Sequence, residues 1–378
     1  MTFQTCEELR AGAEFRLTRT GRFLIAELRV PHRVISTSAR NGGQKDSTRF
    51  LVNHQSCEAS DHRERHDYIR EMGPEAYHDA VCREVSLPPE LVAMMGTAAN
   101  MNYASIVERR NGDLAATAVV TAGVQGNAVC AGDPAQWCES ERGWEKVVLP
   151  AGTINTMLLL NRPMTEGALA RAVVTMTEGK SAALQRLGIR SLYSQDSATG
   201  TGTDQYCVAA PLSGWNPLTS ASPHVKLGEV IGLAVRDAAL EALRWQNGLE
   251  SSYTRGLFHA LGRYGLAESS FFEDVAPLLT ERELELLRKN GNAVFYEPLV
   301  GACAYAVAAI LDRVRYGVLP ADAAREALRQ QAATLAAALA ARPDRWAKFH
   351  ASLGEADPER PAAVILSAVA MGWSSKWQ

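Results

Sequence analysis

The sequence lacks an apolar run long enough to cross a membrane. Its longest candidate, Leu299 to Leu311, is shorter than the roughly 20 apolar residues that a membrane-spanning helix needs. We therefore expect a buried helix there. The first residues, MTFQTCEELRAGAEF, contain early acidic side chains and no apolar stretch typical of a signal peptide. These features predict a cytoplasmic protein with no membrane partner.

A strong charge of either sign is also missing. The 378 residues carry a formal net charge of −3, so the sequence offers no broad basic surface, and we expect no nucleic-acid partner. Charged residues make up 21% of the chain and hydrophobic residues 47%, which is typical of a soluble globular protein and argues against a disordered or fibrous chain.

Paired cysteine motifs are absent. No two cysteines have the CxxC spacing of a zinc or redox site, and their number is odd, which fits a reducing compartment better than a disulfide framework. We expect mostly free thiols in the core from Cys6, Cys57, Cys82, Cys130, Cys138, Cys207 and Cys303.

One histidine-rich segment, NHQSCEASDHRERH, offers metal ligands in His54, Cys57, His62 and His66. His62 and His66 are four residues apart and would share a helix face. However, Glu64 forms an HxExH pattern, not the HExxH of zinc proteases, and the spacing fits no standard structural zinc site. We assign no metal ligand, leave zinc open as an alternative, and consider His54 a candidate contact to a substrate.

Strand and helix patterns alternate up to about Gly248. Extended runs flank Thr20-Gly21 and Asn111-Gly112, which predicts two antiparallel hairpins. Further apolar extended segments run from Val147 to Leu149 and from Ile154 to Asn161.

Two long helices follow these extended segments. One is predicted from the N-cap Thr165 to Gly188, because its apolar residues recur on one helical face. The other is predicted from the N-cap Ser222, with Pro223 at the first helical position, to about Gly248.

Beyond Gly248 the strand patterns almost vanish. The segments TERELELLRK, LVGACAYAVAAILDRVRYG and PADAAREALRQQAATLAAALAAR are helical by period and by alanine and leucine content. We predict an α+β fold with a mixed or largely antiparallel sheet and packed helices over residues 1–248, followed by an all-helical domain over residues 249–378.

A glycine-rich loop, SATGTGTDQY, separates the two predicted long helices. It carries only the first two glycines of a GxGxxG fingerprint, and no GxxxxGK[ST] phosphate loop occurs in the chain, so we exclude dinucleotide binding through these motifs. We interpret the loop as a turn in which Gly200 and Gly202 adopt unusual dihedral angles. The turn would then present the hydroxyls of its threonines and the carboxylate of its aspartate. The alternative is a plain loop whose threonines bind local backbone groups.

Several motifs occur together in one order: STSARNGGQ, MGTAAN, VVTAGVQGNAVCAGD, AGTINTMLLLNRP, VVTMTEGKSAAL, ATGTGTDQ and HVKLGEVIG. In this order and spacing, over roughly Val34 to Leu243, the chain resembles the adenosylcobinamide amidohydrolase family of corrinoid salvage. The resemblance implies hydrolysis of the amide that joins aminopropanol to the corrinoid ring, which gives adenosylcobyric acid. It implies a cobalt corrinoid as substrate and no tightly bound cofactor.

Three features depart from that resemblance. Gly179 stands where we expect alanine, Pro223 stands where we expect a small polar residue, and the helical half lies outside the family's core. The helical half leaves open an amide hydrolase of another imported metal chelate, such as a siderophore. A non-catalytic corrinoid-binding or sensing protein is a further alternative, and a homo-oligomer is left open.

Amide hydrolysis requires an activated nucleophile, donors for the oxyanion and an acid for the departing amine. Asp204 is a candidate to activate water or to orient Thr201 or Thr203. His224, expected near the second position of its helix, would be held neutral by the helix dipole and is a candidate base or cobalt ligand. Glu178 and Lys180 flank Gly179, whose helical cost of about 1 kcal/mol hints at the close approach of a backbone or a ligand.

Asparagines in small-residue turns are candidates to bind the substrate. Asparagine amides and adjacent N–H groups can contribute to an oxyanion hole or bind the amide arms of a corrin, although asparagine is also a common left-handed turn residue. The predicted substrate contacts are Asn41, Gly42, Gly43, His54, Asn127, Thr153, Asn155, Gly200 and Gly202.

Overall fold

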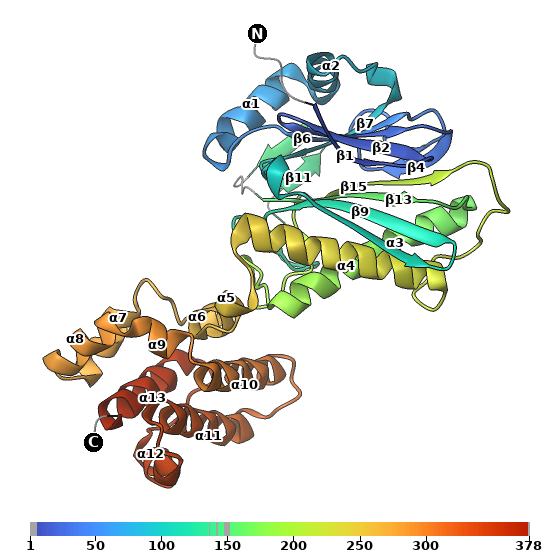
Figure 1. Ribbon diagram of the computed structural model, residues 1–378. Coiled ribbons are helices and arrows are strands. Elements are labelled where there is room, and N and C mark those ends of the chain that lie inside the picture. Colours follow the sequence, from blue (N-terminus) through green and yellow to red (C-terminus); the bar gives the residue numbers. More distant parts are fainter. Residues whose placement is uncertain (1–5, 136, 141–142, 147–151, 377–378) are drawn as a thin grey trace. The chain divides into compact units, whose positions relative to one another are not determined.

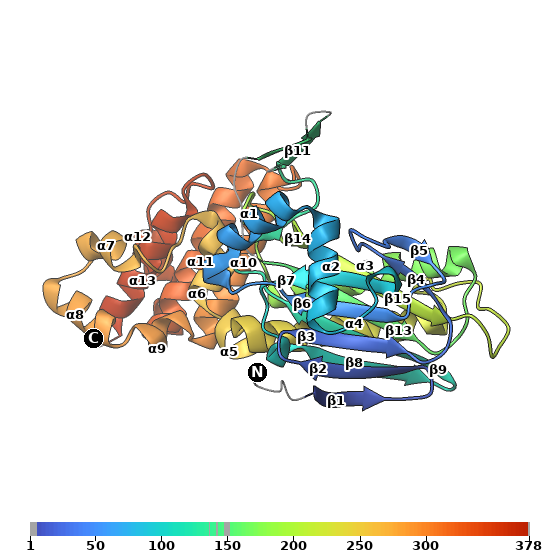
Figure 2. The ribbon, with the colours of Figure 1, turned by 90° about the horizontal axis from the view of Figure 1, so that it is seen from above.

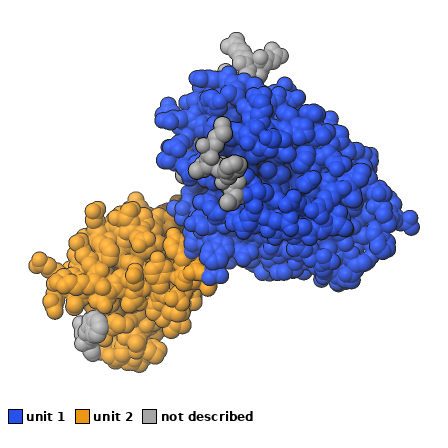
Figure 3. All heavy atoms as spheres, turned by 45° about the horizontal axis from the view of Figure 1, so that its top comes forward, with its two compact units in different colours: residues 1–249 blue, residues 250–378 orange. Residues whose placement is uncertain are grey.

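The computed structural model describes residues 6–135, 137–140, 143–146 and 152–376 (Figure 1). The chain divides into two compact units, unit 1 from Met1 to Leu249 and unit 2 from Glu250 to Gln378 (Figure 3). Each unit has hydrophobic clusters of its own. The predicted segment from Val147 to Leu149 lies outside the described residues.

Unit 1 contains two mixed sheets. The first has the order β1-β2-β3-β6-β7, with bounds Cys6–Ala11, Phe15–Thr20, Phe23–Leu28, Phe50–Gln55 and Val92–Thr97. The second has the order β5-β4-β15-β13-β9-β8, with bounds Gly43–Lys45, His32–Ser36, Gln205–Pro211, Ile154–Leu160, Leu114–Ala122 and Ser105–Asn111. Only the β6–β7 and β13–β15 pairs in these two sheets of the described chain are parallel.

Two short ribbons complete the strands of unit 1. They pair β10 with β14 and β11 with β12, with bounds Ala128–Val129, Gly200–Thr201, Trp137–Ser140 and Gly143–Lys146. The 3-10 helices η1 to η3 span Ala59–Asp61, Pro89–Leu91 and Met101–Tyr103.

Four layers are visible in unit 1 (Figure 1), and Figure 2 looks onto them from the side of the top layer of Figure 1. Helices α1 and α2 (His62–Met72 and Pro74–Glu84) cover the outer face of the five-stranded sheet, and α3 and α4 (Glu166–Leu187 and Lys226–Asn247) cover the outer face of the six-stranded sheet. Apolar side chains such as Leu24, Leu51, Met157 and Leu159 fill the space between the sheets. The α+β prediction is confirmed, with two stacked sheets where one was expected.

Local sequence signals located several elements correctly. Both predicted hairpins form, since β2 pairs with β3 and β8 pairs with β9, and Gly21 and Gly112 have φ angles of 53° and 58°. Helix α3 begins at the Thr165 cap, whose side chain accepts a hydrogen bond from Ala168 N, and ends at a left-handed Gly188. The strong local caps fix this helix from the sequence alone.

The start of α4 differs from the prediction. The helix begins at Lys226 with Val225 as N-cap, and its end at Gly248 is as predicted. Val225 N donates to Ser222 O at 3.0 Å, which closes a turn before the helix. Gly228 lies so close to the Ser222 carbonyl that a side chain there would collide with it. This turn, which packs on Gly228, occupies the residues where Ser222 and Pro223 predicted the start of the helix.

Unit 2 is helical throughout residues 250–376, its described part. The segment Leu299 to Leu311 belongs to α10, whose Val300, Ala304 and Val307 are buried, as predicted. None of the helices in the described residues is both long enough and apolar enough to span a bilayer. Helices α5 to α13 have the bounds Ser251–Thr254, Leu257–Leu261, Phe271–Val275, Glu281–Lys289, Gly291–Phe295, Pro298–Arg315, Ala321–Ala340, Trp346–Ser352 and Pro361–Ser375, and η4 to η6 span Gly262–Tyr264, Ala276–Leu278 and Pro343–Arg345.

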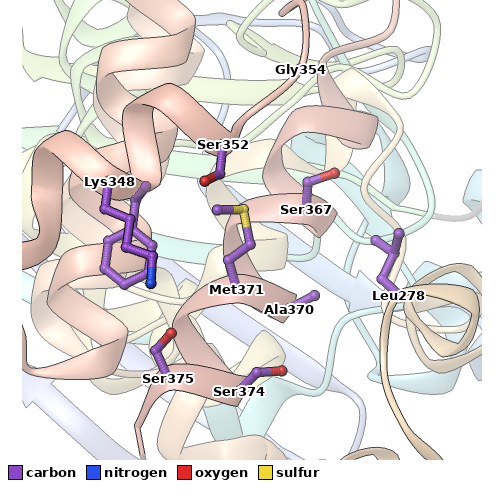
Figure 4. Close-up of a pocket in the computed structure, with 10 residues that line it drawn as sticks. Leu278, Lys348, Ser352, Gly354, Ser367, Ala370, Met371, Ser374 and Ser375 are labelled. Atoms are coloured by element: carbon purple, nitrogen blue, oxygen red, sulfur yellow. The ribbon is translucent and has the colours of Figure 1, made fainter. Parts of the chain in front are cut away.

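A cavity of about 400 Å³ opens in unit 2 between η5, α12 and α13 (Figure 4). Its lining combines apolar side chains with hydroxyls and one lysine, namely Leu278, Lys348, Phe349, Ser352, Gly354, Ser367, Ala370, Met371, Ser374 and Ser375. None of the residues predicted to form the functional site lines this cavity.

Helices α3 and α4 approach each other closely at Gly179. A Cβ atom at residue 179 would lie 3.0 Å from the carbonyl oxygen of Gly232, whereas a Cβ at residue 232 would meet no atom within 4 Å. The predicted close approach at Gly179 is therefore that of another backbone.

We expect Gly179→Ala and Gly232→Ala to change stability in opposite directions. Overpacking against a backbone costs about 1–3 kcal/mol, so the first variant should unfold more easily. The second should be stabilised by up to about 1 kcal/mol, because alanine is the better helix former and has room. Urea unfolding followed by circular dichroism measures both, and equal shifts would contradict the packing described here.

Candidate active site

Five of the sequence motifs meet at one end of the unit 1 sheets. Strands β6, β7 and β9 finish there, and β13 and β15 begin there, as the pairs Gln55↔Thr97, Asn155↔Thr121 and Asn155↔Gln205 show. The two sheets are joined at this end, because Gly96 N donates to Gln205 Oε1 at 3.2 Å. Residues distant in the sequence are thus placed in one polar cluster.

Asp204 lies at the centre of this cluster. Its Oδ1 accepts hydrogen bonds from Ile154 N at 3.0 Å and from Thr201 Oγ1 at 2.6 Å. Its Oδ2 accepts from Thr201 N at 3.1 Å and forms an ion pair with Lys180 Nζ. One carboxylate therefore ties together the glycine loop, the start of β13 and helix α3.

The four donors decide what Asp204 can do. A carboxylate offers about four lone-pair positions, and here all of them are occupied, so Asp204 is poorly placed to take a proton from water. Lys180 has three N–H donors, of which one contacts Asp204, and it has no second acceptor among the described residues. Its side chain is 14% exposed and that of Asp204 is 19% exposed. Lys180 is therefore the group that can donate to a bound ligand.

The glycines of the loop have a steric role. Neither Gly200 nor Gly202 has a positive φ angle, so the predicted need for unusual dihedral angles is wrong. A Cβ at residue 200 would lie 2.5 Å from Lys180 Nζ and closer still to Asp204 Oδ2. A Cβ at residue 202 would lie no nearer than 3.4 Å to its closest neighbour, Asn127 Oδ1. Gly200 thus leaves the space that the ion pair occupies.

Thr203 forms the exposed rim of the loop. Its hydroxyl donates to Gly152 O at 2.7 Å and accepts from Asn127 Nδ2 at 3.3 Å. Asn127 is buried and also donates to Gly152 O at 3.0 Å, while its Oδ1 accepts from Tyr193 Oη at 3.1 Å. Asn127 therefore supports Thr203 from behind.

Asn155 and Thr153 lie deeper still. Asn155 is fully buried, and its Nδ2 donates to Asn53 Oδ1 at 2.8 Å and Gly96 O at 3.0 Å. Thr153 Oγ1 donates to Thr203 O at 2.7 Å. Both side chains are occupied by protein partners, so they support the loop and do not reach its outer surface.

Sequence reasoning missed Asn53, Thr121 and Tyr193. Asn53 donates to Thr121 Oγ1 at 2.7 Å across the two sheets. The available signal was the presence of polar residues in strands with apolar neighbours, as in FLVNHQ and LAATAVVTA. Such a residue must find a buried partner, although the sequence does not identify it.

No hydrogen bond or ion pair among the described residues joins His224 or Glu178 to the glycine loop. His224 is exposed in the turn before α4, so the expected position inside the helix, and with it the dipole argument, is wrong. Glu178 is exposed on α3. It is two residues from Lys180, which corresponds to about 200° around a helix, so the two side chains leave α3 on opposite sides.

The Asn41-Gly42-Gly43 turn also lies elsewhere. Asn41 has a φ angle of 58°, and its Nδ2 donates to Pro89 O at 2.8 Å and Val92 O at 3.0 Å. Val92 is the first residue of β7, whereas the polar cluster is at the end of that strand. Gly42 packs against the Ser38 carbonyl. This turn anchors the edge of a sheet.

His54 belongs to the core beneath α1 and α2. It is 2% exposed, its ring stacks on Phe23 with centroids 4.5 Å apart, and its Nδ1 lies 3.3 Å from Tyr77 Oη. Neighbouring residues of a strand face opposite sides, so His54 points away from the face that carries Asn53. Burial, assisted by the charges of Arg65 and Arg22, lowers the pKa of His54 to about 3.

The structure describes the side chains of three of the four candidate zinc ligands. The His62 side chain lies outside the described residues. Within the side chains that the structure describes, no three histidine, cysteine or acidic residues gather as a metal site.

We expect His54 to make unit 1 less stable in acid. Its folded-state pKa is about 3 and lies below the ordinary 6.5, so the unfolded chain binds the extra proton first. The stabilisation is complete above pH 6.5 and is lost as the pH falls towards 3. His54→Phe should flatten this decline, whereas His224→Gln should not. Urea unfolding between pH 7.5 and about pH 4.5 measures the stability at each pH. If stability falls as steeply with pH in His54→Phe as in the unmodified protein, the lowered pKa of His54 is not its cause.

Comparisons with known proteins identify the family of the chain. The family model described as adenosylcobinamide amidohydrolase matches residues 7–251, which is more than half of the chain. An uncharacterised protein of Methanocaldococcus jannaschii is 34% identical over 183 residues, which cover 46% of this chain and 71% of that protein. The chain therefore belongs to the adenosylcobinamide amidohydrolase family.

Proposed function

We propose that this protein hydrolyses the amide joining aminopropanol to the corrinoid ring of adenosylcobinamide and gives adenosylcobyric acid. The oxygen of water would bond to the carbonyl carbon, the carbon–nitrogen bond would break, and the amine would leave with a proton. Membership of the family supports the substrate class. The observation that carries the chemistry is the pair of Lys180, on α3, with Asp204 of the glycine loop, beside an exposed rim.

Lys180 supplies the positive charge of the proposed site. Its ammonium group can donate to the oxygen on which negative charge develops as the carbonyl is attacked. The same group can pass a proton to the departing nitrogen. Asp204 keeps Lys180 in place, because the carboxylate is itself held by Ile154 N and by Thr201. In this proposal Asp204 positions Lys180 and does not act as the base.

Thr203 would contact the reacting groups on the exposed side, and Gly202 would contact an adjacent part of the substrate. Both are exposed, and a donor on water or on the substrate can reach the hydroxyl oxygen of Thr203. Asn127, Thr153 and Asn155 would hold this rim in position from the buried side. The proposed substrate contacts of unit 1 therefore reduce to Lys180, Gly202 and Thr203.

We further propose that the protein needs no tightly bound cofactor and acts in the cytoplasm. The cobalt belongs to the substrate, and each proposed step uses only proton transfer and charge stabilisation. The cysteines support the location, because Cys57, Cys82, Cys207 and Cys303 are buried as free thiols and free thiols persist in a reducing compartment.

Incubation of the purified protein with adenosylcobinamide tests the reaction. Mass spectrometry should detect adenosylcobyric acid and free aminopropanol, and Lys180→Met should lose this turnover by about 100-fold or more. Arg186→Met, which removes an exposed cation from the same helix, serves as the control. Binding without turnover would instead support a corrinoid-binding protein. If the protein shows neither binding nor turnover of adenosylcobinamide, siderophore amides are the substrates to assay next.

Gly200→Ala and Gly202→Ala form a matched test of the proposed site. Both add one methyl group to the same loop, but only the methyl at residue 200 displaces Lys180 and Asp204. We expect Gly200→Ala to lower kcat by about 100-fold, because misplacing a catalytic group by 1 Å has that effect. Gly202→Ala leaves the ion pair in place but adds a methyl group at a proposed substrate contact, so it should raise KM and keep kcat within about threefold. Steady-state kinetics and circular dichroism of both variants separate this effect from unfolding.

A further inference from the structure

A directed chain of hydrogen bonds runs from Tyr193 to the rim of the proposed site. The carbonyl oxygen of Gly152 can only accept, so the group of Asn127 that lies 3.0 Å from it must be the Nδ2 amide. The Oδ1 of Asn127 then faces Tyr193 Oη at 3.1 Å, and the phenol must donate. The orientation of the Asn127 amide is thereby fixed at both ends.

The same reasoning fixes the direction in which the Thr203 hydroxyl donates its proton. It lies 2.7 Å from Gly152 O and gives its single proton to that carbonyl. It also receives an N–H of Asn127 at 3.3 Å. One lone pair remains on Oγ1, and Thr203 is exposed. Thr203 is consequently an acceptor for a ligand and cannot donate to one.

Tyr193 is itself held firmly in place. Its backbone N donates to Ser191 Oγ at 3.0 Å, and that hydroxyl donates to Asp133 Oδ2 at 2.5 Å. The adjacent Leu192 N donates to Ala128 O at 2.9 Å. Burial raises the pKa of the Tyr193 phenol above its ordinary value, so the hydroxyl keeps its proton at neutral pH.

Asp133 keeps its charge in this arrangement. Burial alone would raise the pKa of its carboxyl, but hydrogen bonds from Ser191, Ser194 and Cys130 N outweigh burial and hold it below the ordinary value. The anchor of the Tyr193 segment thus stays ionised at neutral pH. The segment is coupled to the strand pair β10–β14, which carries Gly200 and Thr201.

We propose that Tyr193 is a positioning residue that, through Asn127, turns the Thr203 lone pair towards an N–H or O–H donor of the reacting pair. The inference deepens the proposed function and rests on it. The donor is the attacking water or the N–H of the amide that is cleaved. Tyr193 does not touch the substrate and acts only through the orientation of the Asn127 amide.

A double-mutant cycle tests the proposal on adenosylcobinamide turnover. Tyr193→Phe should lower kcat about tenfold with little change in KM, because ground-state binding is unaffected. Thr203→Val should lower kcat by at least as much, and Thr203→Ser should retain most activity. In the Thr203→Val background, Tyr193→Phe should change kcat less than twofold, because the two residues act as one unit.

The controls separate this effect from damage to the loop. Leu192→Ala truncates an exposed neighbour of Tyr193 and should leave kcat unchanged. If Tyr193→Phe is equally harmful with valine at position 203, Tyr193 does not act through Thr203 and the proposal is overturned.

A measurement without turnover keeps this inference distinct from the proposed function. Exchange of the Asn127 side-chain amide protons is followed by NMR in protein labelled with ¹⁵N-asparagine, with Asn127→Ala used to assign the signal. Tyr193→Phe should accelerate this exchange about tenfold, and Leu192→Ala should not. Unchanged exchange would overturn the relay even in an active enzyme, whereas accelerated exchange in a protein without turnover would uphold the relay and reject only the reaction.

Discussion

The end of unit 1 that carries the polar cluster depends on the four hydrogen bonds that Asp204 accepts. They come from Lys180, Ile154 N and two groups of Thr201, that is, from a helix, a strand start and the loop itself. A hydrogen bond to a charged group contributes about 1.5–3 kcal/mol, and these four share one acceptor. Each donor therefore helps to place the others, and Gly200 is required because the pair with Lys180 leaves it no side-chain space.

A second, uncharged layer makes this arrangement rigid. The amides of Asn53 and Asn155 bridge the two sheets where the apolar core between them ends. A buried polar network is costly when it is incomplete and specifies one structure when it is satisfied. Thr153 transmits this order outward by binding the Thr203 carbonyl. The exposed rim of the proposed site is thus mounted on buried side chains that never meet a substrate.

Local signals account for what the sequence predicted well. The caps at Thr165 and Gly188 define α3, and the turn glycines define the hairpins. The ordered motifs contain both Lys180 and Asp204, which form an ion pair in the structure. The failures concern contacts that no sequence pattern specifies. The start of α4 is set by a turn packed on Gly228. Likewise, Tyr193 could not be selected from the sequence, because its role exists only through its contact with Asn127.

The position of the polar cluster bears on how much of the chain the proposed chemistry needs. Every group assigned a role in the polar cluster lies between Asn53 and Gln205, on strands, loops and helix α3 of unit 1 and within the matched residues 7–251. Unit 2 is built around a separate cluster that includes Phe271, Val300 and Leu328, all fully buried. A compact unit with its own core can fold by itself. The proposed amide chemistry is therefore assigned to the unit 1 sandwich, and the helical unit adds a second folded body with a cavity of its own.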